Sequence, residues 1–155
     1  MCTSSQKAAL DAHYELMLRW NAKLNLTRIT DRDEAWERHY KESIFLGSKL
    51  PPGPLKIADV GSGAGFPGIP IAVVRPECTV TLIESHQRKA VFLREATRDL
   101  ANVRVLAMRA EDVTGKFDWI ISRAVSPEDV LKLDLAPNIA LLTGHFEVKV
   151  FHVEH

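Results

Sequence analysis

Apolar side chains recur every three or four residues along the first 50 positions of the chain, which is the spacing of helices with one buried face. The first helix is expected to begin at an N-cap, Ser4 or Ser5, and to run to about Leu24. A short polar stretch interrupts the pattern there. A second helix is expected from an N-cap at Thr30 to about Leu50, with acidic residues in its first turn.

A proline-rich stretch at residues 51–54 ends the second helix, and the pattern changes beyond it. It predicts a helical N-terminal cap over residues 1–50 and a second domain over residues 51–155. Short apolar runs in this domain predict strands at 56–60, 79–83, 103–106, 117–122, 139–142 and 146–153, and helices that begin at Ile69, Gln87 and Pro127. Strands that alternate with helices favour an α/β fold, a mostly parallel sheet covered by helices on both faces.

The composition is that of a globular protein: of 155 residues, 46% are hydrophobic and 26% are charged, which excludes fibrous and disordered classes. Twenty basic residues balance twenty acidic residues, so binding of a nucleic acid would need a local basic patch. Cys2 and Cys78 fit neither a disulfide framework nor a metal site. His152 and His155 lie in a strand-like segment, where residues three apart face opposite ways, so no metal is expected. Without a leader or a membrane-spanning run, we expect a cytoplasmic protein.

Three glycines at alternate positions follow the first predicted strand, in the sequence Asp59-Val60-Gly61-Ser62-Gly63-Ala64-Gly65-Phe66-Pro67-Gly68. Glycines let the backbone turn sharply and let a ligand approach the main chain, and the following helix start presents free N–H groups. The part from Gly63 to Gly68 also fits the dinucleotide pattern G-x-G-x-x-G. Counted from Gly61, the sixth position is Phe66, which breaks that fingerprint. The arrangement resembles motif I of S-adenosylmethionine-dependent methyltransferases, which implies that Asp59 faces the zwitterionic methionine part of the cofactor.

Polar residues also follow the next two predicted strands. Glu84 ends the second strand, where one carboxylate can accept hydrogen bonds from both hydroxyl groups of a ribose. The segment Arg109-Ala110-Glu111-Asp112 follows the third strand, at the position where methyltransferases commonly hold an adenine ring. Because the carboxyl ends of parallel strands meet at one edge of a sheet, these residues are expected beside the glycine motif.

Several motifs in series resemble one family, the RsmG (GidB) methyltransferases of 16S ribosomal RNA, over about residues 18–125. The motifs are Arg19-Trp20-Asn21, Asn25-Leu26-Thr27, Arg38-His39-Tyr40, Glu42-Ser43, the glycine motif extended to Pro70, Glu84-Ser85, Arg88-Lys89, Phe92-Leu93, Arg109-Ala110-Glu111 and Ser122-Arg123-Ala124. The resemblance implies a Rossmann-like class I methyltransferase fold, S-adenosyl-L-methionine as cofactor, and methyl transfer to the N7 atom of a guanine.

The resemblance also implies roles for single residues. Arg123 and Asn25 are expected at the catalytic site. Contacts with the RNA are expected from Arg109, Arg123, Arg88 and Lys89. The cofactor is expected to contact Asp59, Gly61, Ser62, Gly63, Gly65, Phe66, Glu84, Ser85, Ala110, Glu111 and Arg123. The chain is expected to act as a monomer, without contact with a membrane. Its expected partner is 16S ribosomal RNA or the assembling small ribosomal subunit.

Elementary chemistry limits what the site must do for this reaction. Guanine N7 carries a lone pair and no proton, so its methylation needs no general base. The protein only has to align N7 with the methyl group and hold the base still. We expect Arg123 to contact guanine O6 or a phosphate, because a hydrogen-bond donor on N7 would block the nucleophile.

Two other functions are compatible with parts of the sequence. A nicotinamide-dependent oxidoreductase would use the glycine register from Gly63 to Gly68. Two features argue against this function: Phe66 breaks the fingerprint counted from Gly61, and the chain has no second domain to carry a substrate. The C-terminal sequence leaves open a non-catalytic binding module of methyltransferase fold, which holds a ligand or a partner without turnover. The family continues after the fifth strand with a Lys-Gly pair, a helix and an antiparallel hairpin, whereas Gly144 passes here directly to His145. We expect a missing segment at this point or a truncated domain, which would leave an unpaired sheet edge.

Overall fold

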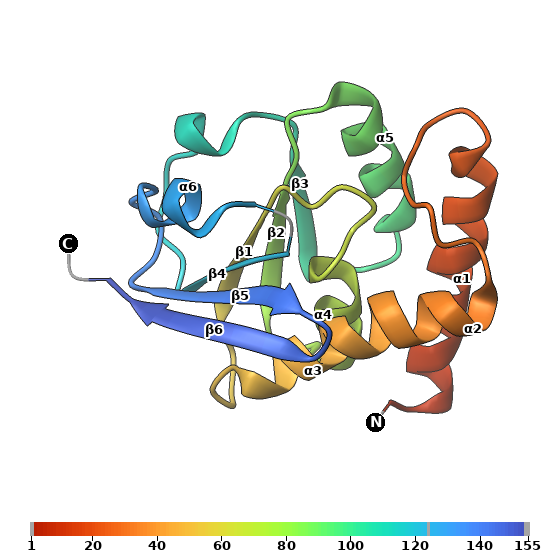
Figure 1. Cartoon of the computed structure of the whole chain (residues 1–155), viewed down its shortest axis with the longest axis horizontal. Coiled ribbons are helices and arrows are strands. Elements are labelled where there is room, and N and C mark those ends of the chain that lie inside the picture. Colours follow the sequence, from red (N-terminus) through yellow and green to blue (C-terminus); the bar gives the residue numbers. More distant parts are fainter. Residues whose placement is uncertain (1, 124, 154–155) are drawn as a thin grey trace.

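The computed structural model describes residues 2–123 and 125–153 (Figure 1). Within these residues, six strands form one sheet in the order β3-β2-β1-β4-β5-β6. The strands are β1 (Lys56–Val60), β2 (Thr79–Ile83), β3 (Val103–Leu106), β4 (Trp119–Ser122), β5 (Asn138–Gly144) and β6 (Glu147–His152). The first five strands run parallel and β6 runs antiparallel to β5, so the predicted mostly parallel sheet is confirmed.

The helical elements agree with the predicted order, and the predicted starts at Gln87 and Pro127 are confirmed, whereas the N-terminal helices and the helix predicted from Ile69 have other bounds. They are α1 (Ser4–Asn21), α2 (Arg32–Ala35), a π-helical turn η1 (Trp36–Tyr40), α3 (Lys41–Lys49), α4 (Gly68–Val74), α5 (Gln87–Ala96), a 3₁₀ turn η2 (Ala110–Asp112) and α6 (Pro127–Leu131). The predicted N-caps are both wrong by a residue. Thr3 caps α1 through a capping box with Gln6, and Asp31 caps α2 by accepting a hydrogen bond from the Glu34 N–H.

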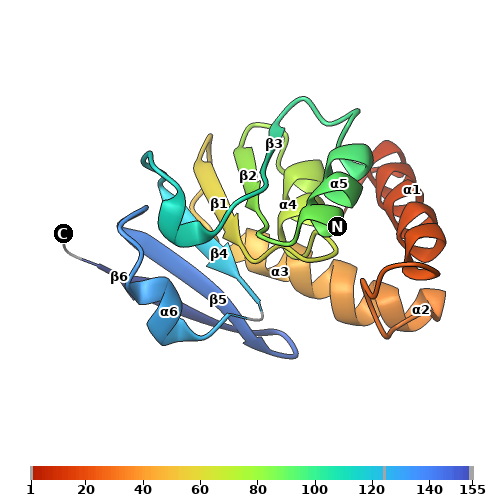
Figure 2. The same cartoon turned by 90° about the horizontal axis from the view of Figure 1, so that it is seen from above.

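Successive residues of the central strands point to opposite faces of the sheet and build two hydrophobic clusters. Ile121 belongs to the larger cluster, together with side chains from α1, α3, α4 and α5, while Ile120 belongs to the smaller cluster around α6. Figure 2 shows the same division, with α1, α3, α4 and α5 on one side of the sheet and α6 on the other. The sheet is therefore the middle of three layers, which explains why its strands are apolar on both faces.

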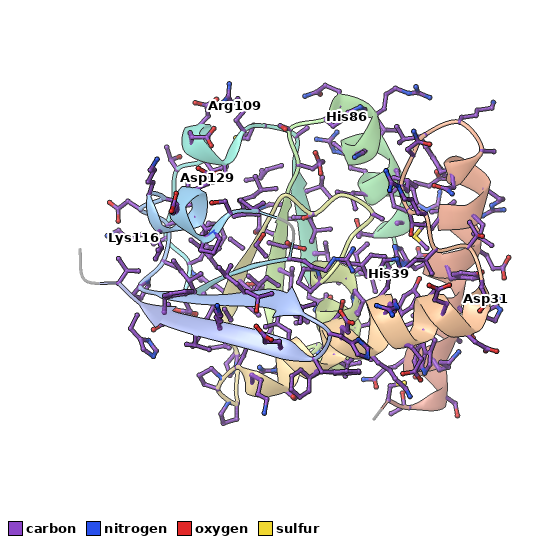
Figure 3. The ribbon with its side chains drawn as sticks, in the orientation of Figure 1. Asp31, His39, His86, Arg109, Lys116 and Asp129 are labelled. Atoms are coloured by element: carbon purple, nitrogen blue, oxygen red, sulfur yellow. The ribbon has the colours of Figure 1, made fainter. Side chains whose placement is uncertain are left out.

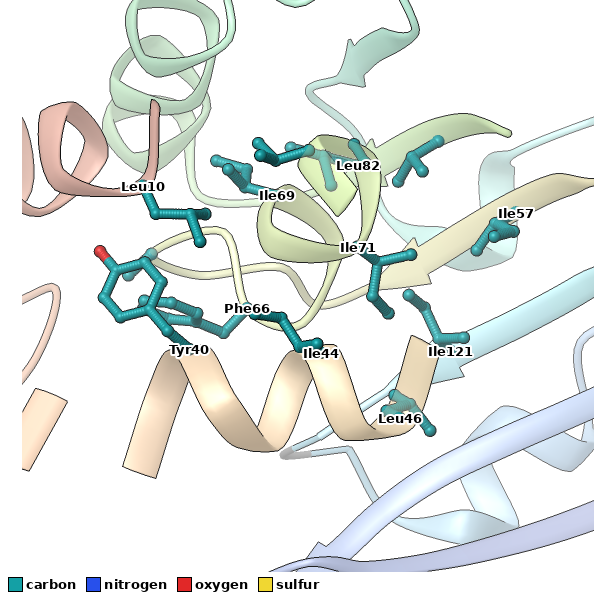
Figure 4. Close-up of a cluster of buried hydrophobic side chains, with 14 of the residues drawn as sticks. Leu10, Tyr40, Ile44, Leu46, Ile57, Phe66, Ile69, Ile71, Leu82 and Ile121 are labelled. Carbon is teal, nitrogen blue, oxygen red and sulfur yellow. The ribbon is translucent and has the colours of Figure 1, made fainter. Parts of the chain in front are cut away.

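The N-terminal helices share the larger cluster with the sheet (Figure 4). Leu10 of α1 and Ile44 of α3 lie in the same buried cluster as Ile57 of β1 and Leu82 of β2. Burial of each such side chain contributes about 1.5–3 kcal/mol relative to exposure. The helical character of the first 50 residues is confirmed, and the boundary between a cap and a separate domain at residue 51 stays a prediction. Within the described residues, no helix is both long and apolar enough to cross a membrane.

A tight hairpin joins β5 to β6, where the sequence led us to expect a missing segment. Gly144 pairs with Glu147 across the hairpin, so His145 and Phe146 form its turn. Phe146 has a φ of 53° and packs edge-on against Phe45 of α3, with 5.3 Å between ring centroids. The chain therefore closes the hairpin directly after Gly144, and β6 is the edge strand that its alternating pattern predicts.

Candidate functional site

The candidate site lies where β1 and β4 end, at the centre of the sheet. These two strands are neighbours, and the chain continues from them toward opposite edges of the sheet. Such a switch point is where open α/β sheets bind ligands. The Ser122 hydroxyl donates a hydrogen bond to the Val60 carbonyl (2.9 Å), which ties the two strand ends together.

The glycine loop between β1 and α4 depends on residues without a side chain. Gly65 has a φ of +102°, and a Cβ atom there would lie 2.4 Å from Cδ1 of Ile69. Gly63 has a φ of +58° and open space around the position of a Cβ atom. Gly65 is therefore needed for close packing, whereas Gly63 leaves the main chain accessible to a ligand.

Asp59 is fully buried at the end of β1 and holds the start of α4. Its Oδ2 atom accepts a hydrogen bond from the Gly68 N–H (2.8 Å). Within the described residues, Oδ1 has no hydrogen-bond partner. Burial raises the pKa of Asp59 to about 8, although the hydrogen bond from Gly68 acts in the opposite direction. An unpaired buried oxygen of this kind suits a positively charged ligand group, such as the ammonium of a methionine.

Glu84 connects the end of β2 to the glycine loop. Its Oε1 atom accepts a hydrogen bond from the Gly63 N–H (2.7 Å), and its Oε2 atom accepts one from the His86 N–H (2.9 Å). Each oxygen of a carboxylate has two lone pairs, so each retains one for a ligand. The backbone thus orients both oxygens before a ribose arrives. His86, which the sequence reasoning missed, caps α5 by accepting a hydrogen bond from the Lys89 N–H.

The helical cap holds the opposite side of the glycine loop through His13, another residue that sequence reasoning missed. Nε2 of His13 donates to the Ala64 carbonyl (2.8 Å), since a carbonyl can only accept. Nδ1 therefore accepts a hydrogen bond from the Tyr40 hydroxyl (2.7 Å). Burial lowers the pKa of His13 to about 4, so the ring is neutral. The sequence did indicate that His13 is buried, because it lies three residues after Leu10 on the predicted buried face of the first helix.

Arg123, which follows β4, is held by His39 of the π-helical turn. Figure 3 labels His39. Nη1 of Arg123 donates to Nδ1 of His39 (2.7 Å), because a guanidinium has no acceptor. Nε2 of His39 consequently carries the ring proton and donates to the Thr27 hydroxyl (2.9 Å). Burial and the charge of Arg123 lower the pKa of His39 to about 3. The neutral imidazole thus holds the guanidinium by a hydrogen bond and adds no second positive charge beside it.

Phe66 of the glycine loop forms the base of this arrangement. The His39 ring stacks on it with 4.4 Å between centroids, and the guanidinium carbon of Arg123 lies 5.2 Å from its centroid. Burial lowers the pKa of Arg123, and the nearby charges of Asp59 and Glu42 act against this shift. The loop, the cap and the end of β4 therefore meet at one guanidinium group.

Asn25, predicted for the catalytic site, is exposed in the loop that follows α1. The side chain that organises this loop is Asn21, whose Oδ1 accepts hydrogen bonds from the N–H groups of Leu26 (2.9 Å) and Thr27 (3.0 Å). A catalytic role for Asn25 stays a prediction. Asn21 acts on the site indirectly, since it places Thr27 against His39.

Apart from Arg123, which follows β4, the predicted RNA-binding residues lie near the carboxyl ends of β2 and β3. Arg88 is exposed in the first turn of α5 and donates to the Lys23 carbonyl (3.4 Å), and Lys89 is half-buried beside it. Arg109, labelled in Figure 3, is exposed and pairs with Glu111 (3.2 Å). The other predicted cofactor residues follow the same strand ends: Ser85 is exposed and Ala110 is half-buried.

A pocket of about 320 Å³ adjoins Arg123 between the cap and the β5–β6 hairpin. It is lined by Ile29, Arg38, His39, Glu42, Arg123, Leu142, Thr143, Gly144 and His145. Larger clefts lie elsewhere, among them one of about 670 Å³ between α1 and α5 and one of about 510 Å³ at the amino ends of the strands. Across the described ranges, no group of three His, Cys, Asp or Glu side chains could hold a metal ion, and His155 lies outside these ranges.

Comparisons with known proteins agree on one family. The family model described as GidB, rRNA small subunit methyltransferase G, matches residues 6–142. A relative named ribosomal RNA small subunit methyltransferase G from Nostoc punctiforme is 43% identical over 118 residues, which are 72% of this chain and 48% of the relative. A relative of the same name from Mycoplasma capricolum is 37% identical and covers 90% of this chain and 62% of its own length. The chain thus spans about half to three fifths of these relatives.

Solved structures with the same fold are methyltransferases. A SAM-dependent methyltransferase from Aquifex aeolicus has a TM-score of 0.55 and 22% identity, and covers 72% of this chain and 67% of its own. Coclaurine N-methyltransferase bound to N-methylheliamine and SAH has a TM-score of 0.59 and 14% identity, and covers 90% of this chain and 53% of its own. At these identities the similarity concerns the fold alone, and it confirms the predicted Rossmann-like class I architecture.

Proposed function

Since this chain belongs to the rRNA small subunit methyltransferase G family, we propose that it transfers a methyl group from S-adenosyl-L-methionine to guanine N7 in 16S ribosomal RNA. The observation that carries this proposal is the position of Glu84. Its two carboxylate oxygens are oriented by the N–H groups of Gly63 and His86 at the rim of the glycine loop. Bound there, a ribose could donate both hydroxyl groups to one carboxylate.

The residues present fit two polar groups of the cofactor, the ribose and the ammonium. Glu84 offers free lone pairs for the ribose, and the unpaired Oδ1 atom of Asp59 suits the ammonium group. When bound, S-adenosylmethionine supplies an electrophilic methyl group on a sulfonium centre. The further cofactor contacts that we propose are Gly61, Ser62, Gly63, Gly65, Phe66, Ser85, Ala110, Glu111 and Arg123.

The titratable side chains of the site suit a reaction that needs no base. His13 and His39 are both neutral, and each uses both ring nitrogens in hydrogen bonds within the protein. Guanine N7 has no proton to remove, so positioning is what the chain must supply. Arg123 is held by His39 and Phe66 and is proposed to donate to guanine O6 or to a phosphate.

The proposed substrate is 16S ribosomal RNA, naked or in the assembling small subunit. The exposed cations Arg88 and Arg109, with Lys89, support an RNA path along the carboxyl ends of β2 and β3. We propose a monomeric enzyme that acts in the cytoplasm. Asn25, exposed in the loop that Asn21 organises, is proposed to face the RNA.

Calorimetric titration with S-adenosylhomocysteine and, separately, with NAD tests the cofactor assignment. The wild-type chain should bind S-adenosylhomocysteine alone, and Glu84→Gln should weaken this binding by about tenfold or more, because one ribose hydroxyl then meets an amide nitrogen. Glu128→Gln, an exposed substitution on α6, is the matched control. Selective binding of NAD would instead favour an oxidoreductase. A folded chain that binds neither ligand would be a non-catalytic module.

A further inference from the structure

The pocket beside Arg123 contains a second charged group, Glu42 of α3. Its side chain is buried, with 7% of the residue exposed, and it lines the pocket together with Arg123. Its Oε1 atom contacts Nδ1 of the His145 ring, which is half exposed on the β5–β6 turn. A buried carboxylate and a guanidinium thus lie in one pocket of about 320 Å³, which is at the small end of the range for ligand sites.

The two groups are complementary to the two edges of a guanine. The N1–H and N2 amino group of guanine are neighbouring donors, which a carboxylate can accept with two parallel hydrogen bonds. O6 is an acceptor on the adjoining side, and a guanidinium can donate to it. Adenine places an acceptor at N1, so a carboxylate would repel it. Enzymes that act on a base commonly take it into a pocket and recognise it by its Watson–Crick edge.

We propose that Glu42 binds the N1–H and N2 amino edge of the target guanine and makes the site specific for guanine, while Arg123 holds O6. This inference rests on the proposed function, since it assigns the base recognition of the same reaction. The N1 and N2 edge of guanine lies on the side of the base away from N7, so in this role Glu42 is a specificity residue rather than a group that activates the nucleophile. His145 is a positioning residue, because its contact leaves each carboxylate oxygen at least one free lone pair.

The experiment measures methyl transfer to the mapped target position with guanosine or inosine at that position. Inosine keeps O6, N7 and N1–H and lacks only the N2 amino group. The wild-type chain should lose between about fivefold and 150-fold in kcat/KM with inosine, the range for one well-made base contact. Glu42→Gln should have a lower kcat/KM with guanosine, and its kcat/KM values for the two RNAs should differ by less than about twofold. Its amide group cannot accept hydrogen bonds from both donors of guanine.

Three controls separate recognition from folding. Glu37→Gln, an exposed residue of the same helical segment that pairs with Lys41, should keep wild-type activity and the inosine penalty. Glu42→Asp keeps the carboxylate and should retain the penalty even at a reduced rate. S-adenosylhomocysteine affinity should be unchanged in all of these variants.

Two results would overturn the inference in different ways. If Glu42→Gln methylates RNA but keeps the wild-type inosine penalty, another group recognises the amino edge, and the proposed function stands. If the wild-type chain binds S-adenosylhomocysteine but methylates no RNA, the proposed function falls, and the role of Glu42 falls with it.

Discussion

Asp59→Asn should stabilise the fold at neutral and alkaline pH, although Asp59 lies at the centre of the candidate site. Burial raises the pKa of Asp59 to about 8, against 3.8 for the free side chain. At pH 7 the folded chain therefore holds a proton that the unfolded chain has released. The stability that this carboxyl contributes at low pH is lost as the pH rises from about 4 to about 8, by about 1.4 kcal/mol per unit. Wild-type stability should thus fall by about 3 kcal/mol between pH 5 and pH 7 from this group alone.

Asparagine at position 59 has no ionisable proton, and its side-chain oxygen can still accept the hydrogen bond from the Gly68 N–H. Its amide nitrogen replaces the buried oxygen that has no partner within the described residues, which costs about 1–3 kcal/mol. The two effects should cancel between about pH 5 and pH 6, and Asp59→Asn should be the more stable protein above pH 7. The same variant should bind S-adenosylhomocysteine more weakly, since its amide nitrogen cannot accept from the ammonium.

Urea unfolding of both proteins at intervals from pH 5 to pH 9 measures the difference in stability. Asp99→Asn, at an exposed site in the turn after α5, controls for the loss of one negative charge. A difference between wild type and Asp59→Asn that stays constant over this pH range would refute the account of Asp59 as a buried proton-binding carboxyl.

Two further predictions concern the glycine loop and the cap. Gly65→Ala should lower the melting temperature much more than Gly63→Ala, because the new Cβ atom would lie 2.4 Å from the Ile69 side chain. A Cβ atom at Gly63 would meet no neighbour, so Gly63→Ala should cost only the about 1–2 kcal/mol of a positive φ. Equal losses on thermal unfolding would contradict this packing. His39 should stay neutral from pH 5 to pH 8, since burial and Arg123 lower its pKa to about 3. A His39 ring signal in NMR that titrates within that range would contradict the hydrogen bond to Arg123.

The strands could be predicted almost completely from the sequence. Each predicted strand is present, with ends that differ by two residues or fewer, because strands buried on both faces appear as short continuous apolar runs. The N-caps could not be assigned as well. Thr3, Ser4 and Ser5 offer similar hydroxyl groups, and the choice of Thr3 depends on Gln6 completing a capping box.

The site residues at the ends of strands could be predicted from the sequence, whereas those contributed by the helical cap could not. Asp59 is the penultimate residue of β1 and Glu84 directly follows β2, and parallel topology brings the carboxyl ends of these strands together. His13 contacts Ala64 from 51 positions earlier in the chain, and His39 stacks on Phe66 from 27 positions earlier. No local sequence pattern specifies how a helical cap docks over such separations. The direct hairpin at Gly144 was also missed, because its turn contains no Asn-Gly or Asp-Gly signal.

The measurement that tests the central claim most directly is the position of the methyl group. The chain is incubated with S-adenosylmethionine and unmodified 16S ribosomal RNA or small subunits, and the RNA is then reduced and treated with aniline, which cleaves at N7-methylguanosine. We predict cleavage at one guanine, and less cleavage in Glu84→Gln when the cofactor is limiting. A methyl group on another atom, or no transfer by a folded chain that binds S-adenosylhomocysteine, would contradict this prediction.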